Sequence, residues 1–355
     1  MENKIIFTLC LIFSFSIISC TPDKSAKQTA ARVVKVAVVI QDPVVDGKRM
    51  HETFKTPGYS FAWHDPWKLT QEYELALEEV SHGTIDYQIT EIIDTHEYFT
   101  FLRKSGEMLS EQRVVELLQE PGWETLKTEG AGFDYKAFVE HFGFDKMRDE
   151  GKIHEVWVWT FPYGGMWESN MMGEGAFWLN SEPTPNVNCT DLLCVMGLNY
   201  ERDLACALES YGHRFESVMM QVYGWWDYEN KSSKQELTNW EKYAGYQKNY
   251  TKFNPEAVHI GNIHFPPNGE KDYDWKNPAR VKTFADNWQH YPDIKEENPR
   301  EIDCSEWGCN HLGYMKWWFS HIPHFEGINP GDKKLNNWWL YVVDYNAARQ
   351  LEKQP

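Results

Sequence analysis

The chain lacks the short motifs that identify common nucleotide-binding proteins and hydrolases. It contains no G-x-x-x-x-G-K-[ST] phosphate loop, no G-x-G-x-x-G dinucleotide fingerprint and no G-x-S-x-G nucleophile turn. No unit is repeated at the period of a solenoid. The remaining indications of function are composition, spacing and individual side chains.

Positive charge is scarce. Asp and Glu total 53 against 35 Lys and Arg, and the formal net charge is −18. Nucleic-acid binding depends on a basic face that neutralises phosphates, so we expect no nucleic-acid partner. A local basic pocket remains compatible with this composition.

Long apolar runs are also scarce, and the clearest one stands at the start of the chain. Ile5 to Ile18 carries no charge and follows Lys4. It is shorter than a comfortable membrane span and has the length of a signal-peptide core. No later stretch is apolar enough to cross a bilayer.

The run ends in Ile17-Ile18-Ser19-Cys20. This tetrapeptide resembles the lipobox of bacterial lipoproteins, and the resemblance covers the targeting segment alone. It implies cleavage before Cys20, attachment of acyl chains such as palmitate to that residue, and a protein anchored outside the cytoplasm. Several acyl chains anchor stably where one does not. The alternative is an ordinary cleaved signal with a coincidental cysteine.

Cysteine is uncommon in the remaining chain. Of seven cysteines, Cys10 leaves with the signal and Cys20 takes the lipid. In an exported protein close pairs are usually disulfides, so we expect two bridges and one leftover thiol, Cys206. The expected bridges are Cys189–Cys194 and Cys304–Cys309. The spacing does not fit a zinc ribbon, the rival interpretation.

Alternating apolar segments predict the fold class. Residues 1–20 are the expected signal, 21–33 a polar tether and 34–222 an α/β core. Within the core, strands are expected at 34–40, 85–93, 154–161 and 191–198, and helices at 68–80, 109–119, 133–148 and 201–222. Strands that alternate with helices predict a doubly wound, mostly parallel sheet. A further strand is expected at 258–265.

After Gly224 the periodicity fades and aromatic residues crowd together. We expect residues 223–355 to form a loop-rich extension packed on the core. Of 17 Trp, twelve follow residue 165, including the pair Trp225-Trp226. Surplus Trp in loops suits stacking on sugar rings. The alternative is a Trp-rich core, and we expect most single Trp residues to be core residues.

Ligands of open α/β sheets bind beyond the carboxyl ends of the strands. The third strand is followed there by a Pro-Tyr-Gly-Gly turn, which contains Tyr163 and leads to Trp167 and Glu168. An aromatic ring beside a carboxylate fits a sugar site, but a structural turn fits equally. The fourth strand is followed by Asn199, Tyr200 and Glu201.

The last expected helix of the core carries Glu209, His213 and Glu216, spaced four and three residues apart. This spacing puts them on one face, with Arg214 pointing elsewhere. Two carboxylates around an imidazole hold a divalent metal or tune an acid and base. A solvated charged face is the alternative, and Gly212 within the helix favours a special role.

Three weaker signals follow. His264 ends the expected late strand before a Pro-Pro-Asn-Gly turn. The acidic run from Asn268 to Asp274 resembles the opening of a calcium loop but lacks its glycine and final glutamate. His311, His321 and His324 lie among Trp and Phe, and Pro323 disfavours a helical metal pair, so a packed aromatic cluster is expected.

These observations support three hypotheses about function. The first is a glycoside hydrolase of the cell envelope, with Glu168 in one role and Glu209 or Glu216 in the other. The second is a metal-dependent hydrolase or esterase that uses Glu209, His213 and Glu216, with His264. The third is a lipoprotein that captures glycans without chemistry. The sequence indicates no organic cofactor, and whether a divalent metal is bound depends on which of these hypotheses holds.

All three hypotheses share an expected cleft at the carboxyl edge of the sheet, lined by Glu168, His213 and one of the helix glutamates. A regular helix carries His213 roughly 18 Å from Glu201, toward the opposite edge. The cleft therefore requires a break at Gly212 or a side pocket built by the C-terminal loops. Otherwise Glu168 with Asn199, Tyr200 and Glu201 is the fallback site.

Overall fold

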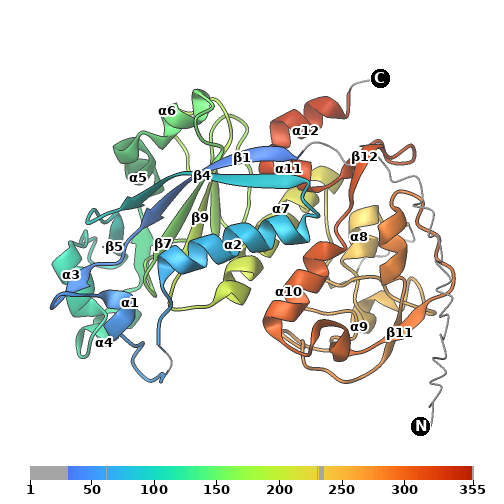
Figure 1. Ribbon diagram of the computed structural model, residues 1–355, viewed down its shortest axis with the longest axis horizontal. Helices are drawn as coiled ribbons and strands as arrows, with labels where there is room; N and C mark the ends of the chain where they lie inside the picture. Colours follow the sequence, from blue (N-terminus) through green and yellow to red (C-terminus); the bar gives the residue numbers. More distant parts are fainter. Residues whose placement is uncertain (1–30, 61, 230, 232–235, 354–355) are drawn as a thin grey trace, which may run out of the picture.

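The computed structural model describes residues 31–60, 62–229, 231 and 236–353. The expected signal, Cys20 and most of the tether lie outside these residues. The described chain is a mixed α/β structure around one five-stranded sheet, in the order β4-β1-β7-β9-β8 (Figure 1). Four smaller sheets have two strands each.

Four of the five central strands match the expected ones to within two residues at each end. The sheet consists of β1 (Arg32–Ile40), β4 (Ile85–Asp94), β7 (Glu155–Thr160), β8 (Ser169–Met172) and β9 (Leu193–Asn199). Strands β4, β1, β7 and β9 run parallel, whereas β8 runs antiparallel to β9. The mostly parallel sheet is confirmed, and the short strand β8 was not expected.

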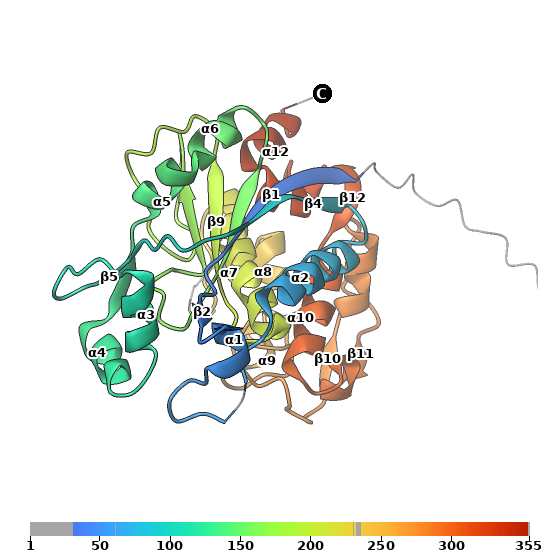
Figure 2. The same ribbon diagram turned by 60° about the vertical axis from the view of Figure 1, so that its left-hand side comes forward.

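Apolar layers cover both faces of the sheet, because successive side chains of a strand point to opposite sides. In β1, Val36 and Val38 belong to one buried cluster, and Ala37 and Val39 to the other. Helices α2 (Pro66–Val80) and α7 (Leu204–Tyr223) cover the first face. Helices α5 (Tyr135–Phe142) and α6 (Phe144–Asp149) cover the second (Figure 2).

The expected helix at 133–148 is thus two helices. Gly143 separates them in the left-handed conformation, with a φ of 70°. Helix α3 (Glu111–Leu117) lies within the expected 109–119, and the Ser110 side chain accepts a hydrogen bond from Arg113 N at its start. The expected helix at 201–222 is α7, which begins later because Asp203 caps it.

The remaining elements are short. The helices are α1 (Met50–Thr53), α4 (Gly122–Glu129), α8 (Asn239–Tyr243), α9 (Gln247–Tyr250), α10 (His311–Ser320), α11 (Trp339–Val343), α12 (Tyr345–Leu351), η1 (Ala285–His290) and η2 (Cys304–Trp307). The antiparallel pairs are β2 (Val44–Val45) with β3 (Lys48–Arg49), β5 (Thr100–Leu102) with β6 (Ala131–Phe133), β10 (Val281–Thr283) with β11 (Arg300–Ile302), and β12 (His324–Ile328) with β13 (Leu335–Asn337).

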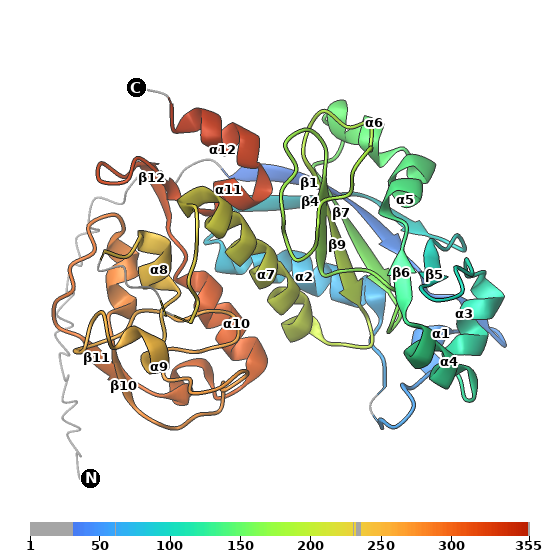
Figure 3. The same ribbon diagram turned by 180° about the vertical axis from the view of Figure 1, so that it is seen from behind.

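Helix α7 is the junction between the sheet and the residues that follow it in the chain. It packs against β9 on one side and against α8 and α10 on the other (Figure 3). Arg214 points into the sheet side, where its guanidinium lies 2.7 Å from Glu155 of β7 and donates to Val342 O. Both charged groups are buried, so removing one partner would leave an uncompensated charge.

The expectation of a strand at 258–265 is wrong. In the described residues Val258 forms only an isolated bridge with Thr283. Gly261 has a φ of 92°, and the amides of Ile260 and Gly261 both donate to Tyr243 O. The apolar pattern there reflects burial of a loop, since Ile260 and Ile263 are fully buried.

The prediction of a Cys189–Cys194 disulfide is also wrong, because both thiols are free. The predicted Cys304–Cys309 disulfide is confirmed, with a Cα–Cα distance of 4.6 Å. Cys194 on β9 belongs to the apolar cluster of the first sheet face, and Cys189 to that of the second. Two thiols on opposite faces of one sheet cannot meet. Cys206 is a free, half-buried thiol, as expected.

Tryptophan is mainly a core residue in this protein. Eleven of the 17 Trp are buried, including both members of the pairs at 317–318 and 338–339. The exposed ones are Trp167, Trp178 and Trp225. Among the described residues, none of the helices is both long and apolar enough to cross a membrane.

Candidate functional site

Helix α7 presents a chemically mixed face to the C-terminal residues. Cys206, Glu209, His213 and Glu216 follow one another at spacings of three, four and three, which places them on one side of the helix. The helix continues without a break through Gly212. Glu209 and Glu216 are each 9% exposed, so this face is covered and is not a solvated one.

Three histidines from separate segments converge on the carboxylate of Glu209. His264 Nε2 lies 3.3 Å from Oε1, and His311 Nε2 lies 3.1 Å from Oε2. His213 Nε2, one turn along α7, lies 3.9 Å from Oε1. The expected grouping of His213, His264 and a helix glutamate is therefore present.

Two of these imidazoles have a second carboxylate behind them. His213 Nδ1 lies 3.2 Å from Glu216 Oε2, and His264 Nδ1 lies 3.6 Å from Asp272 Oδ1. Such outer carboxylates fix the tautomer of an imidazole and leave its other nitrogen free to bind a metal. This arrangement is typical of metal-ligating histidines.

The loop at residues 261–265 (the His264 loop) is held against α7 by contacts on both sides. Glu216 Oε1 accepts a hydrogen bond from Ile263 N, at 3.0 Å. The Tyr314 hydroxyl donates to the carbonyl oxygens of Asn262 and Phe265. The C-terminal residues thus build a side pocket on α7, the second of the two arrangements that the sequence allowed.

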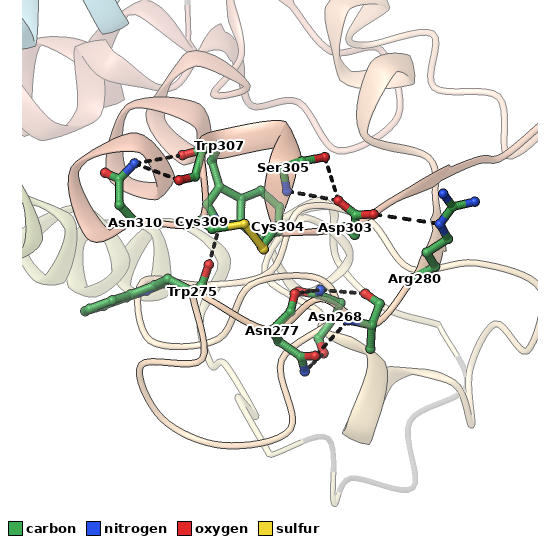
Figure 4. The surroundings of a disulfide bond; sticks show 12 residues. Asn268, Trp275, Asn277, Arg280, Asp303, Cys304, Ser305, Trp307, Cys309 and Asn310 are labelled. Carbon is green, nitrogen blue, oxygen red and sulfur yellow. Dashed lines mark hydrogen bonds and ion pairs between the residues drawn. A yellow bond between two sulfur atoms is a disulfide. The ribbon is translucent and has the colours of Figure 1, made fainter.

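His311 is positioned by a disulfide-closed turn. Cys304–Cys309 closes the segment just before it, and Asn310 caps helix α10, of which His311 is the first residue (Figure 4). The imidazole stacks on the Trp275 ring, with centroids 3.8 Å apart. Trp307 within the closed turn donates its indole N–H to Trp275 O. These contacts leave His311 few alternative rotamers.

Glu168 reaches the same place from the sheet. Its Oε2 lies 4.0 Å from His213 Nε2, and its carbonyl accepts a hydrogen bond from Gly197 N. A side chain at Gly197 would collide with Trp167 O, so this glycine lets the turn after β7 close on β9. Burial raises the pKa of Glu168, although 35% of its side chain stays exposed. A carboxyl in that state suits an acid and base role.

The charges at the centre are strongly coupled. Burial by itself would raise the pKa of Glu209. Contacts with His213, His264 and His311 have a larger, opposite effect and keep the pKa well below its ordinary range. Burial lowers the pKa of His213, but Glu209 and Glu216 outweigh this and raise it to about 10. Without a metal, His213 is therefore protonated between these carboxylates, and a cation that bound its Nε2 would replace that proton.

The donor set fits a divalent metal. The ligand atoms of Glu209, His213 and His264 lie within 4.8 Å of one another, and so do those of Cys206, Glu209 and His311. Imidazole, carboxylate and thiolate are the ligands of Zn²⁺ in proteins.

An open cleft of about 790 Å³ adjoins the histidines. His213, Glu216 and His264 belong to its lining, together with four aromatic rings, three lysines, three further carboxylates and two asparagines. The aromatic lining consists of Trp226, Tyr228, Tyr246 and Phe265. The cleft is large enough for a drug-sized or disaccharide-sized ligand.

The structure places several other expected site residues elsewhere. The Glu201 carboxylate contacts the Thr56 hydroxyl, and its backbone N–H donates a hydrogen bond to Asn199 Oδ1. Tyr200 is fully buried, and its hydroxyl donates a hydrogen bond to Gln41 O. These contacts involve Thr56, Gln41 and neighbouring residues of the same turn, and none of them joins Glu168.

The aromatic residues near Glu168 face a different cleft. Trp167 lines one of about 320 Å³ with Tyr135 and Trp178, while Tyr163 packs edge-on against Trp123. Trp225 is exposed and is not among the residues that line the cleft beside His213.

The two weaker histidine and calcium signals have structural roles. His321 packs on Trp317 and His324 stacks on His82, as expected for an aromatic cluster. Asn268 donates to the carbonyls of Asn277 and Ala279, and Asp274 accepts from Asn277, so these groups are used within the loop.

Sequence reasoning missed three residues of the site. His311 was assigned to packing, Cys206 to a leftover thiol and Asp272 to the calcium pattern. The spacing of three between Cys206 and Glu209 was the available signal for the first turn of the face. Nothing in the sequence brings His311, about a hundred residues later, to that turn.

Comparison of the chain with protein-family models, with curated proteins and with solved structures found no match.

Proposed function

We propose that this protein is a divalent-metal-dependent hydrolase, with the metal held by Glu209, His213 and His264. One observation carries the proposal. Imidazoles from separate segments aim their Nε2 atoms at a single buried carboxylate, while Glu216 and Asp272 face the Nδ1 atoms from behind. Surface charge clusters do not require such outer carboxylates, but metal sites commonly have them.

The reaction follows from the neighbours of this centre. A cation here would lower the pKa of a bound water and polarise a substrate carbonyl. Glu168, beside His213, would accept a proton from the attacking water as the water oxygen bonds to the carbonyl carbon. The same carboxyl then returns the proton to the leaving oxygen or nitrogen, so one ester or amide bond and one water become an acid and an alcohol or amine.

The aromatic cleft supports a carbohydrate-bearing substrate. Trp226, Tyr228, Tyr246 and Phe265 offer flat rings beside the catalytic centre, and such rings stack on sugars. An ester or amide substituent on an envelope glycan combines this binding with the metal chemistry. A glycan-binding lipoprotein would use the same cleft without turnover.

A glycoside hydrolase is the second candidate. Glu168 and Glu209 both approach His213 Nε2, at 4.0 and 3.9 Å, so two carboxylates do share one site. A glycosidase needs open space for the scissile bond between them. Here an imidazole nitrogen occupies the region close to both, which favours the metal-dependent hydrolase.

The proposal also covers location and architecture. Cys20 anchors the enzyme by lipid in the bacterial cell envelope, and the tether holds the α/β body outside the membrane. We interpret the helices on both sheet faces as a doubly wound core, with residues 223–355 packed on it as an extension that supplies His264 and His311.

The test is metal content coupled to turnover. Purified protein should contain a tightly bound divalent metal, and chelation should abolish release of acyl groups from acylated oligosaccharides. Glu209→Gln should lose both metal and turnover, while Glu140→Gln, in an ion pair with Lys136 on helix α5, should lose neither. Turnover that survives complete metal removal would favour the glycosidase, and cleaved glycosidic bonds would identify it.

A further inference from the structure

We infer that the site holds two divalent cations, with the carboxylate of Glu209 bridging them. This inference rests on the proposed function, because it adds a second position to the one formed by Glu209, His213 and His264. The second position lies between Cys206, His311 and the other oxygen of Glu209.

The two oxygens of Glu209 face different ligands. Oε1 lies near His264 and His213, whereas Oε2 lies 3.1 Å from His311 Nε2. The ligand atoms within each group lie within 4.8 Å of one another, and the two groups share Glu209 alone. A carboxylate placed in this way binds one cation through each oxygen, at the separation of about 3.5–4 Å that is typical of two-metal hydrolases.

His311 has a nitrogen without a hydrogen-bond partner. Its Nε2 is shielded from solvent and makes no well-formed hydrogen bond with any described residue, and the Glu209 carboxylate is the group beside it, at 3.1 Å. The same holds for His264 Nε2. Shielded polar atoms without partners are costly, and each of these two points toward one of the proposed cation positions.

Cys206 completes the second group. It lies one turn before Glu209 on α7, forms no disulfide and is half-buried. Thiolate, imidazole and carboxylate together form a strong donor set for Zn²⁺. Cys206, which has no disulfide partner in the expected pairing, is thus a ligand of the second cation.

The number of ligands distinguishes this arrangement from its rival. Each group supplies three protein ligands, the number found in catalytic zinc sites, where water occupies the fourth position. A single cation held by Glu209 and all three histidines would have four protein ligands and would be closed to substrate. It would also leave Cys206 unused. Two open positions side by side fit a hydrolase better.

The deciding experiment measures cation stoichiometry in the exported chain, purified in detergent and loaded with Co²⁺. We expect two equivalents after dialysis and a sulfur-to-cobalt charge-transfer absorption from Cys206. Cys206→Ser and His311→Gln should each reduce the content to one equivalent, and Cys206→Ser should abolish the absorption. His264→Gln should also retain one equivalent but keep the absorption.

Cys194→Ala and His290→Gln are the matched controls, because they remove a thiol and an imidazole away from the cluster, and both should keep two equivalents. One equivalent without sulfur absorption in the unmodified protein would overturn the inference and leave the proposed function standing. No bound cation would overturn both. If Cys206→Ser does not fold, the stoichiometry and absorption of the unmodified protein still decide.

Discussion

Gly212 of helix α7 and Ile263 of the His264 loop are packed so closely that only a glycine fits. A β-carbon at Gly212 would lie 2.1 Å from Ile263 Cδ1 and 2.6 Å from its Cγ1. Ile263 is fully buried, so its side chain has little room to move away. This contact sets the distance between the loop and the helix, and therefore between His264 and Glu209.

Gly212→Ala should weaken both stability and metal binding. Helix propensity favours alanine, but overpacking a buried contact costs about 1–3 kcal/mol, which exceeds that gain. Displacement of the loop should move His264 from Glu209 and lower metal affinity at least severalfold. Denaturant unfolding and competition with a chelator measure the two effects.

Gln221→Ala on the exposed surface of α7 is the matched control and should change neither property. A Gly212→Ala protein with unchanged metal affinity would show that the loop tolerates the added methyl group, and would contradict this packing argument.

Glu168→Gln should abolish turnover while keeping the bound metal. The amide preserves the shape of the side chain but cannot accept the proton of the attacking water. Loss of a general base typically costs about 10²–10⁴-fold in rate. Steady-state kinetics with metal analysis of the same sample separates this effect from loss of the cation. Glu174→Gln, at an exposed position nearby, should behave as the unmodified protein, and full turnover by Glu168→Gln would remove this residue from the mechanism.

The sequence predicts the central sheet well because its strands obey strong local rules. The run from Val34 to Ile40 is β-branched and apolar, and it is buried on both faces in the structure. The segment from Val258 to Phe265 also carries Val, Ile and Phe at intervals, yet it is a loop. Gly261 there adopts a positive φ, and Tyr243 accepts the amide hydrogen bonds, so tertiary contacts replace strand pairing.

The site is predictable only in part, for a related reason. Glu209, His213 and Glu216 share one helix, so spacing alone places them together. His264 comes from an irregular loop and His311 from the start of α10, and their positions depend on packing against Gly212 and Trp275. Patterns along a chain do not encode such contacts. The same limitation explains the wrong Cys189 and Cys194 pairing, since proximity in sequence said nothing about sheet faces.

Cys20→Ala should release the protein from membranes without changing its fold. The lipid on Cys20 is the proposed anchor, and burial of each acyl methylene contributes about 0.8 kcal/mol to membrane binding. Fractionation of cells that express each variant measures the anchoring, and Cys10→Ala within the expected signal core is the control. Continued sedimentation of Cys20→Ala with washed membranes would contradict the lipoprotein assignment.

Acid should destabilise the protein below pH 6.5 through buried histidines that stay neutral. Burial lowers the pKa of His259 from 6.5, and its Nδ1 accepts a hydrogen bond from the Trp288 indole. Below pH 6.5 the unfolded chain binds a proton there that the folded chain does not, so the stabilising contribution is present above 6.5 and is lost as the pH falls. Each such group changes the free energy of unfolding by at most about 1.4 kcal/mol per pH unit.

His259→Gln should reduce this slope, because glutamine can still accept the indole hydrogen bond but does not titrate in this range. Denaturant unfolding from pH 8 to pH 4.5 measures the slope for both proteins. The comparison at pH 8, where both side chains are neutral, separates any packing loss from the titration. Equal slopes would show that His259 becomes protonated in the folded protein.

The Cys304–Cys309 disulfide should support the metal site as well as the fold, because the turn that it closes is followed directly by Asn310 and His311. For so short a loop, chain entropy predicts about 2 kcal/mol of stabilisation. Replacing both cysteines by serine should therefore lower the free energy of unfolding by about that amount.

The double replacement should also free the turn that carries Trp307, whose indole N–H holds Trp275 against His311. The second cation should then dissociate more readily than the first, and stepwise chelation followed by metal analysis would measure this. Equal loss of both cations would show that the disulfide stabilises the fold without positioning His311.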